Sequence, residues 1–439
     1  MRPLFLLVLL ASCGFAQGTL PLSLNRAVEI ALTPEGSARV ALAEQSIRQA
    51  ETRVAQAKAA FWPNLDGSVT DRNQTVNLRT FGFDFDFPAL GFSLPGIAGP
   101  FNVFDARASA QAQVLDFSTI RKYRASRTSL DATKADLDQT RTQVSEQVAR
   151  AYLASLRADA ALDTVRANVE LSEALEKQAQ SLKDAGTGTG IEVTRAQVQL
   201  ANDRQRLIVA DNDRRRAVLQ LLRTMGLNLT APVELTDKLS YQQVNVAALE
   251  ASLDTARKER SDLKAQVQHQ EAARMNYSSV QAERLPSIGA FGDYGTIGTA
   301  IVGAHPTHTI GITLNVPLFD GGRRDARRQE SFSQYRQEQI RTLDLELQIE
   351  LDVRLALDSL RSADGQVEAA RQGLTLAQNE LEQARRRYQA GVTNSLEVTD
   401  AQTRLDRARD NQINAVYNHN LARLDLAAAT GTIQEYVHQ

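Results

Sequence analysis

Three acidic residues follow two glycine turns and are the first candidates for chemistry in this 439-residue chain. Glu192 follows Gly186, while Glu397 and Asp400 follow Gly391. Because Glu397 and Asp400 are three positions apart, they share one face of a helix. Carboxylates at a narrow opening attract cations, repel anions and can hold the opening through hydrogen bonds or ion pairs. The helix dipole also favours acidic residues in any first turn, which is the simpler explanation of each one.

The sequence offers no pattern typical of an enzyme or of a cofactor site. The run Gly186–Gly190 follows a helical stretch and lacks the Gly-Lys-Ser/Thr ending of a phosphate-binding loop. His305 and His308 flank a proline in a turn, and a solvated loop is favoured there over a surface metal site. We therefore predict no catalysis, no cofactor and no bound metal.

Charge and hydropathy narrow the class of protein further. The chain has 50 Lys and Arg residues against 52 Asp and Glu residues, so it lacks the basic excess that a nucleic-acid partner requires. Aromatic residues make up only 5%, which favours long helices packed through small side chains. Beyond the N-terminal segment, no run of about 18 uncharged apolar residues predicts a transmembrane helix.

The N-terminus has the pattern of an export signal: a positive residue, a short apolar run and small residues. Cleavage after Ala16 is favoured, and it would make residues 1–16 a signal peptide and remove Cys13, the only cysteine. The stretch Leu10–Cys13 also resembles a lipoprotein box, which would leave Cys13 acylated. Cleavage after Ala16 would leave no thiol chemistry in the mature protein.

The remainder of the chain is a tandem duplication of about two hundred residues. With an offset of 205, matching positions include Gly186 and Gly391, Glu192 and Glu397, and Gly226 and Gly431. The offset is 223 between Pro63 and Pro286, which places an insertion in the first copy. We therefore predict a first repeat over 17–227, an equatorial linker over 228–256 and a second repeat over 257–439.

Each repeat is predicted to contain a helix, a β-hairpin, a very long helix, a glycine turn and a return helix. The helix of the first repeat is Glu35–Trp62. Its β-hairpin lies over 65–115, with strands Leu65–Arg72 and Asp105–Leu115. Its helical hairpin lies over 118–224, with helices Ser118–Asp184 and Glu192–Thr224. The helix of the second repeat is Arg257–Arg284. Its β-hairpin lies over 287–318, with strands Ser287–Thr299 and Thr307–Leu318. Its helical hairpin lies over 323–429, with helices Arg323–Gln389 and Glu397–Ala429.

The spacing of apolar residues supports these assignments. Alanines seven positions apart on the last helix indicate a coiled coil; they are Ala401, Ala408, Ala415 and Ala422. Ile310, Ile312 and Leu314 alternate with polar residues, as in a strand with one apolar face. Four strands with open edges neither close a barrel nor sit in lipid. The strands must therefore pack inside a larger protein or pool between chains, and three chains would pool twelve.

Several motifs, in this order, resemble the TolC-like outer-membrane efflux protein family. One motif lies at the second strand-to-helix switch and contains Pro317, Gly321 and Gly322. The others are the stretches Tyr388–Gly391 and Glu397–Gln402 at the second tip turn, and Leu22–Leu32 near the mature N-terminus. The resemblance extends over essentially the whole mature chain, and the duplication is its most specific element.

This resemblance implies a mainly α protein with a membrane β-barrel. A homotrimer would pool four strands per chain into a 12-stranded barrel in outer-membrane lipid, continued by an α-helical tunnel across the periplasm. The implied function is a passive exit duct of a tripartite efflux or type I secretion system. Its partners would be an inner-membrane pump and a periplasmic adaptor that contacts the tip turns at Gly186 and Gly391. The alternatives are a periplasmic adaptor and a soluble coiled-coil scaffold.

The resemblance also implies a gate at the periplasmic tips. The gate residues would be Glu192, Tyr388, Glu397 and Asp400, each repeated three times around the axis. Tyr388 is similar to a tyrosine that bonds toward the acidic residue of the other hairpin. The family's basic residue two positions after the tip glycine is replaced by Thr393, and Arg195 and Arg387 are the candidates for the missing cation.

Overall fold

The computed structural model describes residues 20–33, 35–81, 86–87, 92–93, 96–243 and 248–438. The chain divides into two compact units, and each one combines segments of both repeats. The helical unit comprises Met1–Gln45, Ala135–Lys264 and Leu343–Gln439, and the sheet unit comprises Ser46–Lys134 and Ala265–Thr342. The predicted signal peptide, with Cys13, lies outside the described residues.

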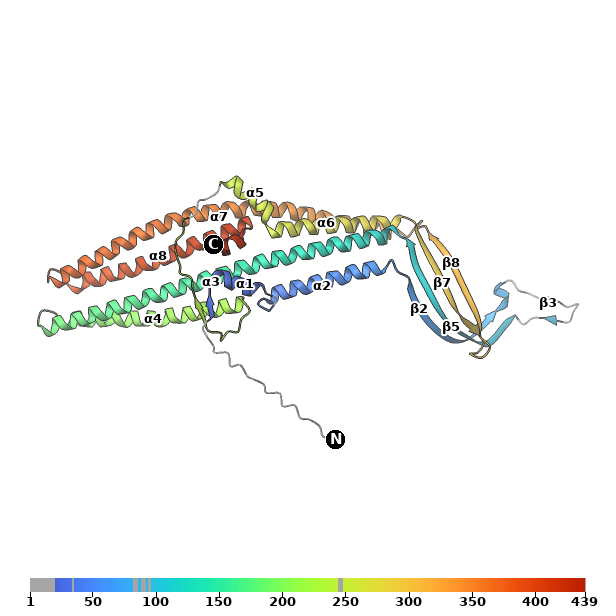
Figure 1. Ribbon diagram of the computed structural model, residues 1–439, viewed down its shortest axis with the longest axis horizontal. Helices are drawn as coiled ribbons and strands as arrows, with labels where there is room; N and C mark the ends of the chain where they lie inside the picture. The colour runs from blue at the N-terminus through green and yellow to red at the C-terminus, as the bar shows by residue number, and fades with distance from the viewer. Residues whose placement is uncertain are drawn as a thin grey trace, which may run out of the picture. The chain divides into compact units, whose positions relative to one another are not determined.

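Two helical hairpins dominate the helical unit (Figure 1). One consists of α3 (Phe117–Asp184) and α4 (Gly190–Thr224), and the other of α7 (Arg323–Gln389) and α8 (Ser395–Thr430). The four predicted long and return helices are confirmed, with ends that differ by two residues or fewer. None of the described helices is both long enough and apolar enough to cross a membrane.

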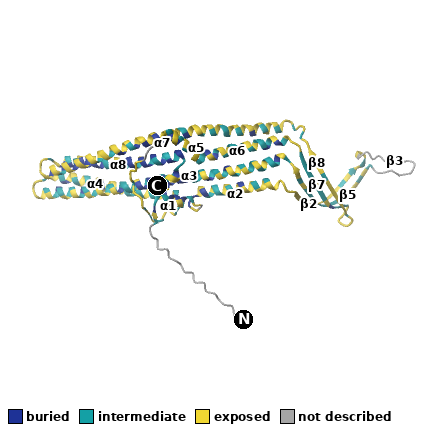
Figure 2. Cartoon of the chain, turned by 45° about the horizontal axis from the view of Figure 1, so that its top comes forward, coloured by how far each residue is buried: buried dark blue, intermediate teal, exposed yellow. Residues whose placement is uncertain are grey.

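The alanine seam predicted from the heptad spacing forms the core of the second hairpin. Ala401 and Leu405 of α8 pack against Ala377, Leu381 and Ala384 of α7. Farther along, Ala415 packs against Val367, and Ala422 packs against Leu360 and Ala363. Figure 2 shows that the buried residues gather along the facing sides of these helices. Small seam residues allow the two helix backbones to approach closely, as in other coiled coils.

Four glycines end the helices of the two repeats in the same way. Gly186, Gly226, Gly391 and Gly431 all have left-handed backbones, with φ between 69° and 80°. In each case the next residue donates its N–H to the carbonyl oxygen five positions earlier, at 2.8–3.0 Å. This is the Schellman arrangement, which satisfies the last carbonyl groups of a helix. The duplication seen in the sequence is therefore also a duplication of backbone geometry.

The predicted helix Arg257–Arg284 is confirmed over most of its length, but it is interrupted at Arg260. The chain forms α5 (Leu249–Glu259), an extended Arg260 with φ −61° and ψ 118°, and then α6 (Ser261–Gln281). A short 3-10 turn, Ala282–Arg284, follows α6. The first repeat has a similar interruption, with α1 (Leu24–Leu32) preceding α2 (Ala38–Ala59).

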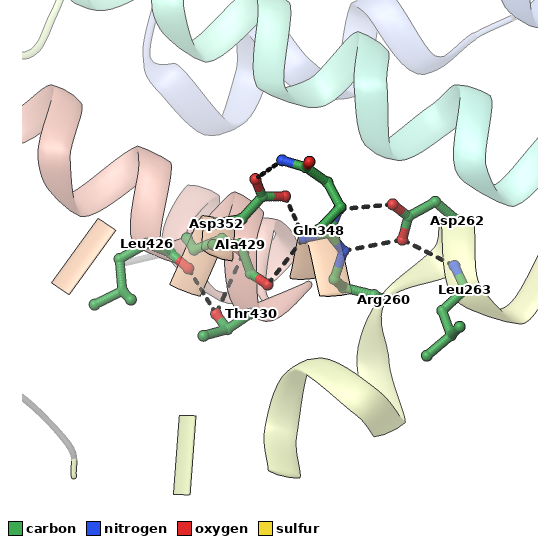
Figure 3. A network of polar contacts seen from close by, with 9 residues as sticks. Arg260, Asp262, Leu263, Gln348, Asp352, Leu426, Ala429 and Thr430 are labelled. Carbon is green, nitrogen blue, oxygen red and sulfur yellow. Dashed lines mark hydrogen bonds and ion pairs between the residues drawn. The ribbon is translucent and has the colours of Figure 1, made fainter. Parts of the chain in front are cut away.

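Tertiary contacts hold the interruption at Arg260 (Figure 3). The guanidinium donates to both carboxylate oxygens of Asp262, at 3.0 and 2.7 Å, and to Asp352 of α7, at 2.9 Å. Its Nη1 also lies 3.5 Å from the carbonyl oxygen of Ala429, at the end of α8. The Arg260 side chain is only 12% exposed, so it links three elements from the interior of the helical unit.

Three short elements, two strands and a helix, were not predicted from the sequence. β1 (Leu20–Leu22) pairs in parallel with β6 (Val233–Leu235), which lies within the segment predicted as a linker. The hydroxyl of Tyr152 donates to the carbonyl oxygen of Leu22 at 2.9 Å and lies 2.8 Å from Asp237, which anchors this pair of strands on α3. The chain then ends in a short helix, α9 (Ile433–His438).

The two predicted β-hairpins join into one antiparallel sheet. Its strands are β2 (Asn64–Asn77), β5 (Ile97–Leu115), β7 (Ser287–Gly298) and β8 (His305–Asn315), in the order β2-β5-β7-β8. The insertion predicted in the first copy carries a 3-10 turn, Leu78–Phe81, and the short strands β3 (Asp86–Phe87) and β4 (Phe92–Ser93). Asn315 ends β8, Gly321 and Gly322 follow with φ values of 69° and 85°, and α7 begins at Arg323.

The sheet has one apolar and one polar face. Register places Leu65, Val69, Ala108, Ala110, Ile310 and Ile312 on one face. The other face carries Asp66, Ser68, Asp105, Arg107, Ser109, Asp293 and Thr309. The apolar residues of the edge strands are exposed, since Leu65, Ile310 and Ile312 are at least 78% accessible. Their exposure in a single chain indicates a face that another medium or partner covers.

Candidate functional site

The predicted gate residues gather at the tips of the two helical hairpins, within the helical unit. Glu192 of α4 and Tyr388 of α7 line one small pocket, together with Ser172, Leu175, Gln199, Ser395 and Gln402 among others. Glu397 lies in the first turn of α8, and Asp400 follows it by three residues. Gly186 and Gly391 form the adjoining turns, and a Cβ at either glycine would meet no atom within 4 Å. The structure therefore brings Glu192 and Tyr388 together across the two hairpins.

The expected hydrogen bond between Tyr388 and Glu192 is not formed. Tyr388 is 9% exposed, and its hydroxyl has no hydrogen-bond partner among the described residues. The Glu192 carboxylate instead accepts the backbone N–H of Thr189 at 3.0 Å, which caps α4. Burial and the nearby negative charge of Glu192 both raise the pKa of Tyr388. The charge of Glu192 therefore acts on Tyr388 through space, without a hydrogen bond between the two side chains.

The cation that the sequence lacks at Thr393 is supplied by Arg387. Its Nη1 lies 3.4 Å from Oε1 of Glu397, and the hydroxyl of Thr393 donates to the other carboxylate oxygen. Arg387 lies in the last turn of α7, so these contacts connect the two sides of the tip turn. Arg195, the other candidate, is exposed and forms no ion pair within the described residues.

Asp400 has a different environment from Glu397. Its side chain is exposed, and no hydrogen bond or ion pair reaches it in the described part of the chain. Its charge is therefore not neutralised by any of the described residues. An unpaired carboxylate affects its surroundings through its field, whereas Glu397 also holds a local structure together.

A buried carboxylate pair next to the tip pocket was not predicted as a site. Asp203 of α4 is 1% exposed, and Asp406 of α8 is 5% exposed. Both share the guanidinium of Arg206, at 3.5 and 3.4 Å. Ser172 of α3 donates to Asp203 at 2.5 Å and accepts from Gln402 of α8 at 2.6 Å. This network joins the first hairpin to the second through polar contacts, as does the hydrogen bond from Arg409 of α8 to Asn168 of α3.

Only one of the two buried carboxylates is fully satisfied. Asp203 accepts hydrogen bonds from Ser172 and Gln199, while the Oδ1 atom of Asp406 is buried without a partner among the described residues. Burial, followed by repulsion from Asp203, raises the pKa of Asp406 to about 6, although Arg206 and Arg409 oppose that shift. Asp410 adds a smaller repulsion. Relative to the unfolded chain, the folded protein therefore favours the protonated form of Asp406.

We expect the stability of the helical unit to fall between about pH 4 and pH 6 because of Asp406. A carboxyl whose folded pKa is raised stabilises the fold fully below its unfolded pKa, near 3.8, and loses this effect as the pH rises through about 6. The difference corresponds to about 3 kcal/mol. Asp406→Asn should remove this loss, so its melting temperature at pH 7 should exceed that of the unchanged protein.

Thermal melting in detergent at pH 4, 5, 6 and 7 would check this expectation. Asp163→Asn is the matched control, because Asp163 is 76% exposed and pairs only with Arg166 of the same helix among the described residues. The control should follow the pH dependence of the unchanged protein. An identical pH dependence for Asp406→Asn and the control would contradict the assignment.

Comparison with known proteins adds independent information to this geometry. The family model described as outer membrane efflux protein matches residues 32–227 and 252–432. These two stretches contain both helical hairpins and the four strands of the large sheet. They also contain each of the predicted gate residues, which lie in α4, α7 and α8.

Individual relatives cover most of the chain. The outer membrane protein TolC of Vibrio cholerae is 27% identical over 339 residues, which are 73% of this chain and 76% of that protein. The pyoverdine export outer membrane protein OpmQ of Pseudomonas aeruginosa is 26% identical over 391 residues, 86% of this chain and 78% of that protein.

Solved structures show the same fold. The outer-membrane channel OprN superposes with a TM-score of 0.79 at 17% sequence identity, over 93% of this chain and 90% of that one. The outer membrane protein VceC of Vibrio cholerae gives a TM-score of 0.75 at 18% identity, over 93% and 96% of the two chains.

Proposed function

Because this chain belongs to the outer membrane efflux protein family, we propose that three copies of it form one exit duct that is gated at the tips of its helical hairpins. The family consists of channels of the Gram-negative outer membrane, which are passive conduits rather than enzymes. Its members work with periplasmic adaptors and inner-membrane pumps. The trimer and the gate are the parts proposed for this chain.

The main support for the trimer is the order of the strands. β2 and β8 lie at the two edges of the sheet, and each neighbouring pair of strands is antiparallel. β2 and β8 therefore run in opposite directions, so β8 of one chain can pair with β2 of the next without breaking the alternation. Open edges are not tolerated in lipid, which requires such a ring to close.

The number of copies follows from the width of the duct. Two chains would give eight strands, and the interior of an eight-stranded barrel is just wide enough to be filled by its own side chains. Three chains would give twelve strands, which is the smallest multiple of four that leaves a passage. In this arrangement the face with Leu65, Val69, Ile310 and Ile312 meets lipid, and the face with Asp105 and Arg107 meets the lumen.

The helical unit offers a second surface for a neighbouring copy. Leu343, Leu347, Leu351 and Leu355 of α7 are spaced four residues apart and are 48–69% exposed. Residues four apart lie on one face of a helix. A stripe of exposed leucines along a helix is unfavourable in water, so a second chain is its natural cover.

The proposed gate consists of Glu192, Tyr388, Glu397 and Asp400. Threefold repetition turns each carboxylate into a ring, and the contacts of Glu397 with Arg387 and Thr393 stabilise the tip of each hairpin. The turns at Gly186 and Gly391 are the proposed adaptor contacts, because their surroundings are open. Pro317, Gly321 and Gly322 form the proposed switch from strand to helix, where two left-handed glycines redirect the chain.

Neighbouring residues of β8 provide a test of the proposed duct. Ile312 lies on the apolar face and Thr313 on the polar face. We expect Ile312→Lys to lose outer-membrane assembly, because a lysine that faces lipid costs up to about 2–4 kcal/mol in each chain. Thr313→Lys is the matched control, and it should assemble because its charge would face water.

Native mass spectrometry of protein extracted from outer membranes in detergent measures the outcome. A trimer is expected for the unchanged protein and for Thr313→Lys. A dimer or monomer of the unchanged chain, or equal assembly of both variants, would contradict the proposal. The same masses tell whether the mature chains begin at Gln17 or at an acylated Cys13.

A further inference from the structure

An ion-pair cluster lies on the polar face of the sheet, within the sheet unit. The Nε atom of Arg107 is 2.8 Å from Oδ1 of Asp105, and its Nη1 atom is 3.1 Å from Oδ1 of Asp293. All three side chains are half-buried, with exposures of 29%, 17% and 19%. Arg107 and Asp105 belong to β5, and Asp293 belongs to β7.

The register of the sheet brings these three residues together. Asp105 precedes Arg107 by two positions, so both side chains are on the same face of β5. Asp293 pairs with Ser109, the next residue on that face. Gly295 is paired with Arg107, and a Cβ at Gly295 would lie 2.4 Å from the Cβ of Arg107. A glycine at 295 is therefore required for β5 and β7 to approach closely beside Arg107.

The cluster carries an excess of negative charge. One guanidinium is matched against two carboxylates, which leaves a net charge of −1 in each chain. The strands of this face carry two more charged residues, Asp66 and Arg72, whose charges cancel each other. Because Arg107 holds both carboxylates in place, the excess charge has a fixed position in the sheet.

We propose that Asp105, Arg107 and Asp293 form a charged girdle that makes the lumen of the duct selective for cations. This inference rests on the trimer proposed above, in which the polar face lines the passage. Three copies would place a net charge of −3 around one level of the lumen. Charges of one sign on the wall of a pore concentrate counter-ions and repel ions of the same sign. The solutes favoured are cations and molecules with a positive group.

The girdle is independent of the acidic residues at the hairpin tips. It belongs to the sheet unit, whereas Glu192, Glu397 and Asp400 belong to the helical unit. Opening or closing the tips does not change the charges of Asp105, Arg107 and Asp293 in the sheet. We therefore expect cation preference to persist in channels whose tips are open.

A series of substitutions changes the girdle charge in single steps. Arg107→Gln gives −2 in each chain, the unchanged protein has −1, Asp293→Asn gives 0, and Asp105→Asn with Asp293→Asn gives +1. Reversal potentials in planar bilayers under a potassium chloride gradient report the cation-to-anion permeability ratio. We expect the ratio to fall in that order, by roughly twofold or more per step after salt screening, and to drop below one for the double variant.

Two further variants make the test specific. Asp71→Asn removes the same charge from the opposite face of β2, since Asp71 pairs with Phe104, and it should leave the ratio unchanged. Arg107→Lys keeps the charge and should keep the ratio of the unchanged protein. Asn keeps the shape of Asp and can still accept a hydrogen bond from Arg107, and Lys keeps the charge of Arg, so these chains are expected to assemble.

The outcomes separate the girdle from the duct. A cation-to-anion permeability ratio that does not change along the charge series would overturn the girdle and leave the duct intact. The same conclusion would follow if Arg107→Lys changed the ratio as much as Arg107→Gln does. Purified, unchanged protein that forms no channel would overturn the duct and the girdle with it. Channels whose ratios follow the series, with Asp71→Asn unchanged, would support both.

Discussion

Glu397→Ala is expected to raise single-channel conductance in planar bilayers by shifting the hairpin tips toward their open state. In the structure the carboxylate of Glu397 receives the Thr393 hydroxyl and lies 3.4 Å from the Arg387 guanidinium. Alanine removes both contacts and leaves Arg387 without its partner. The last turn of α7 and the first turn of α8 are then no longer connected through these side chains.

The size of the effect follows from the number of copies. Glu397 and Arg387 are 38% and 57% exposed, so their interaction contributes only about 0.5 kcal/mol per chain after solvent screening. If the contact forms only in the closed state, its three copies in the proposed trimer would together contribute about 1.5 kcal/mol, which is roughly a tenfold change in the ratio of closed to open tips. A shift of this size is measurable as open probability as well as conductance.

Matched variants distinguish this contact from a general weakening of the hairpin. Glu380→Ala breaks the ion pair of Glu380 with Arg404, which also links α7 to α8 but lies away from the tip turn, and it should leave conductance unchanged. Arg387→Ala should reproduce Glu397→Ala, and the double variant should add little. Equal conductance for Glu397→Ala and Glu380→Ala would remove Glu397 from the gate.

Asp400 offers a contrast within the same experiment. Because its carboxylate has no partner in the described part of the chain, Asp400→Ala breaks no local contact. Any effect of this variant should therefore appear in ion preference and not in the stability of the closed tips. The two residues, which share a helix face, would then have separable roles.

Gly226→Ala is expected to destabilise the helical unit strongly, although it adds only one methyl group. Gly226 has a φ of 69°, and an added Cβ would lie 1.6 Å from the carbonyl oxygen of Gly36. A left-handed backbone costs an L-residue about 1–2 kcal/mol, and forcing neighbouring backbone apart adds about 1–3 kcal/mol. The total of about 2–5 kcal/mol should appear as a lower melting temperature and a smaller yield of assembled protein.

Gly391→Ala separates the two causes. Gly391 has nearly the same φ, 70°, but a Cβ there would have no atom within 4 Å. This variant should therefore show only the backbone cost and retain most of the assembled yield. Melting in detergent and recovery from outer membranes measure both variants under identical conditions. If both variants lost melting temperature and assembled yield equally, the close approach of Gly226 to Gly36 would not contribute to the effect of Gly226→Ala.

The elements with strong local signals were predictable from the sequence. α7 begins at Arg323 and ends at Gln389, as predicted, because glycines flank an uninterrupted pattern of apolar residues that contains no proline. The four helix-ending glycines were also found, through the offset of 205 between the repeats. Such features depend on residues close together in the chain, so their sequence pattern is sufficient.

The missed elements depend on contacts between distant residues. Arg260 is a good helix former, and its neighbours contain no glycine or proline, yet it interrupts a helix because Asp262, Asp352 and the end of α8 hold it extended. β1 and β6 are three residues each and pair across more than two hundred positions. Short segments of this kind have no periodicity from which pairing can be predicted.

The candidate site was partly predictable for the same reason. Arg387 was one of two candidates for the cation near Glu397, and the structure selects it because α7 ends beside the first turn of α8. The expected bond from Tyr388 to Glu192 is not formed, and a carboxylate oxygen of Glu192 instead accepts the backbone N–H of Thr189. Asp203 had a signal that was overlooked, because it occupies a seam position at which the neighbouring heptads have alanine.

The two open edges of the sheet also determine how a defective chain affects its neighbours. The β8 edge of a chain can be blocked, for example by a proline, which cannot donate a hydrogen bond to a neighbouring strand. Such a chain can still pair through β2, but its β8 cannot pair with β2 of the next chain. In the proposed trimer, every ring that such a chain enters would remain unsealed. With equal amounts of normal and blocked chains, random assembly in threes would leave only about one ring in eight intact. Damage to one edge would therefore be dominant over the normal chains in the same ring.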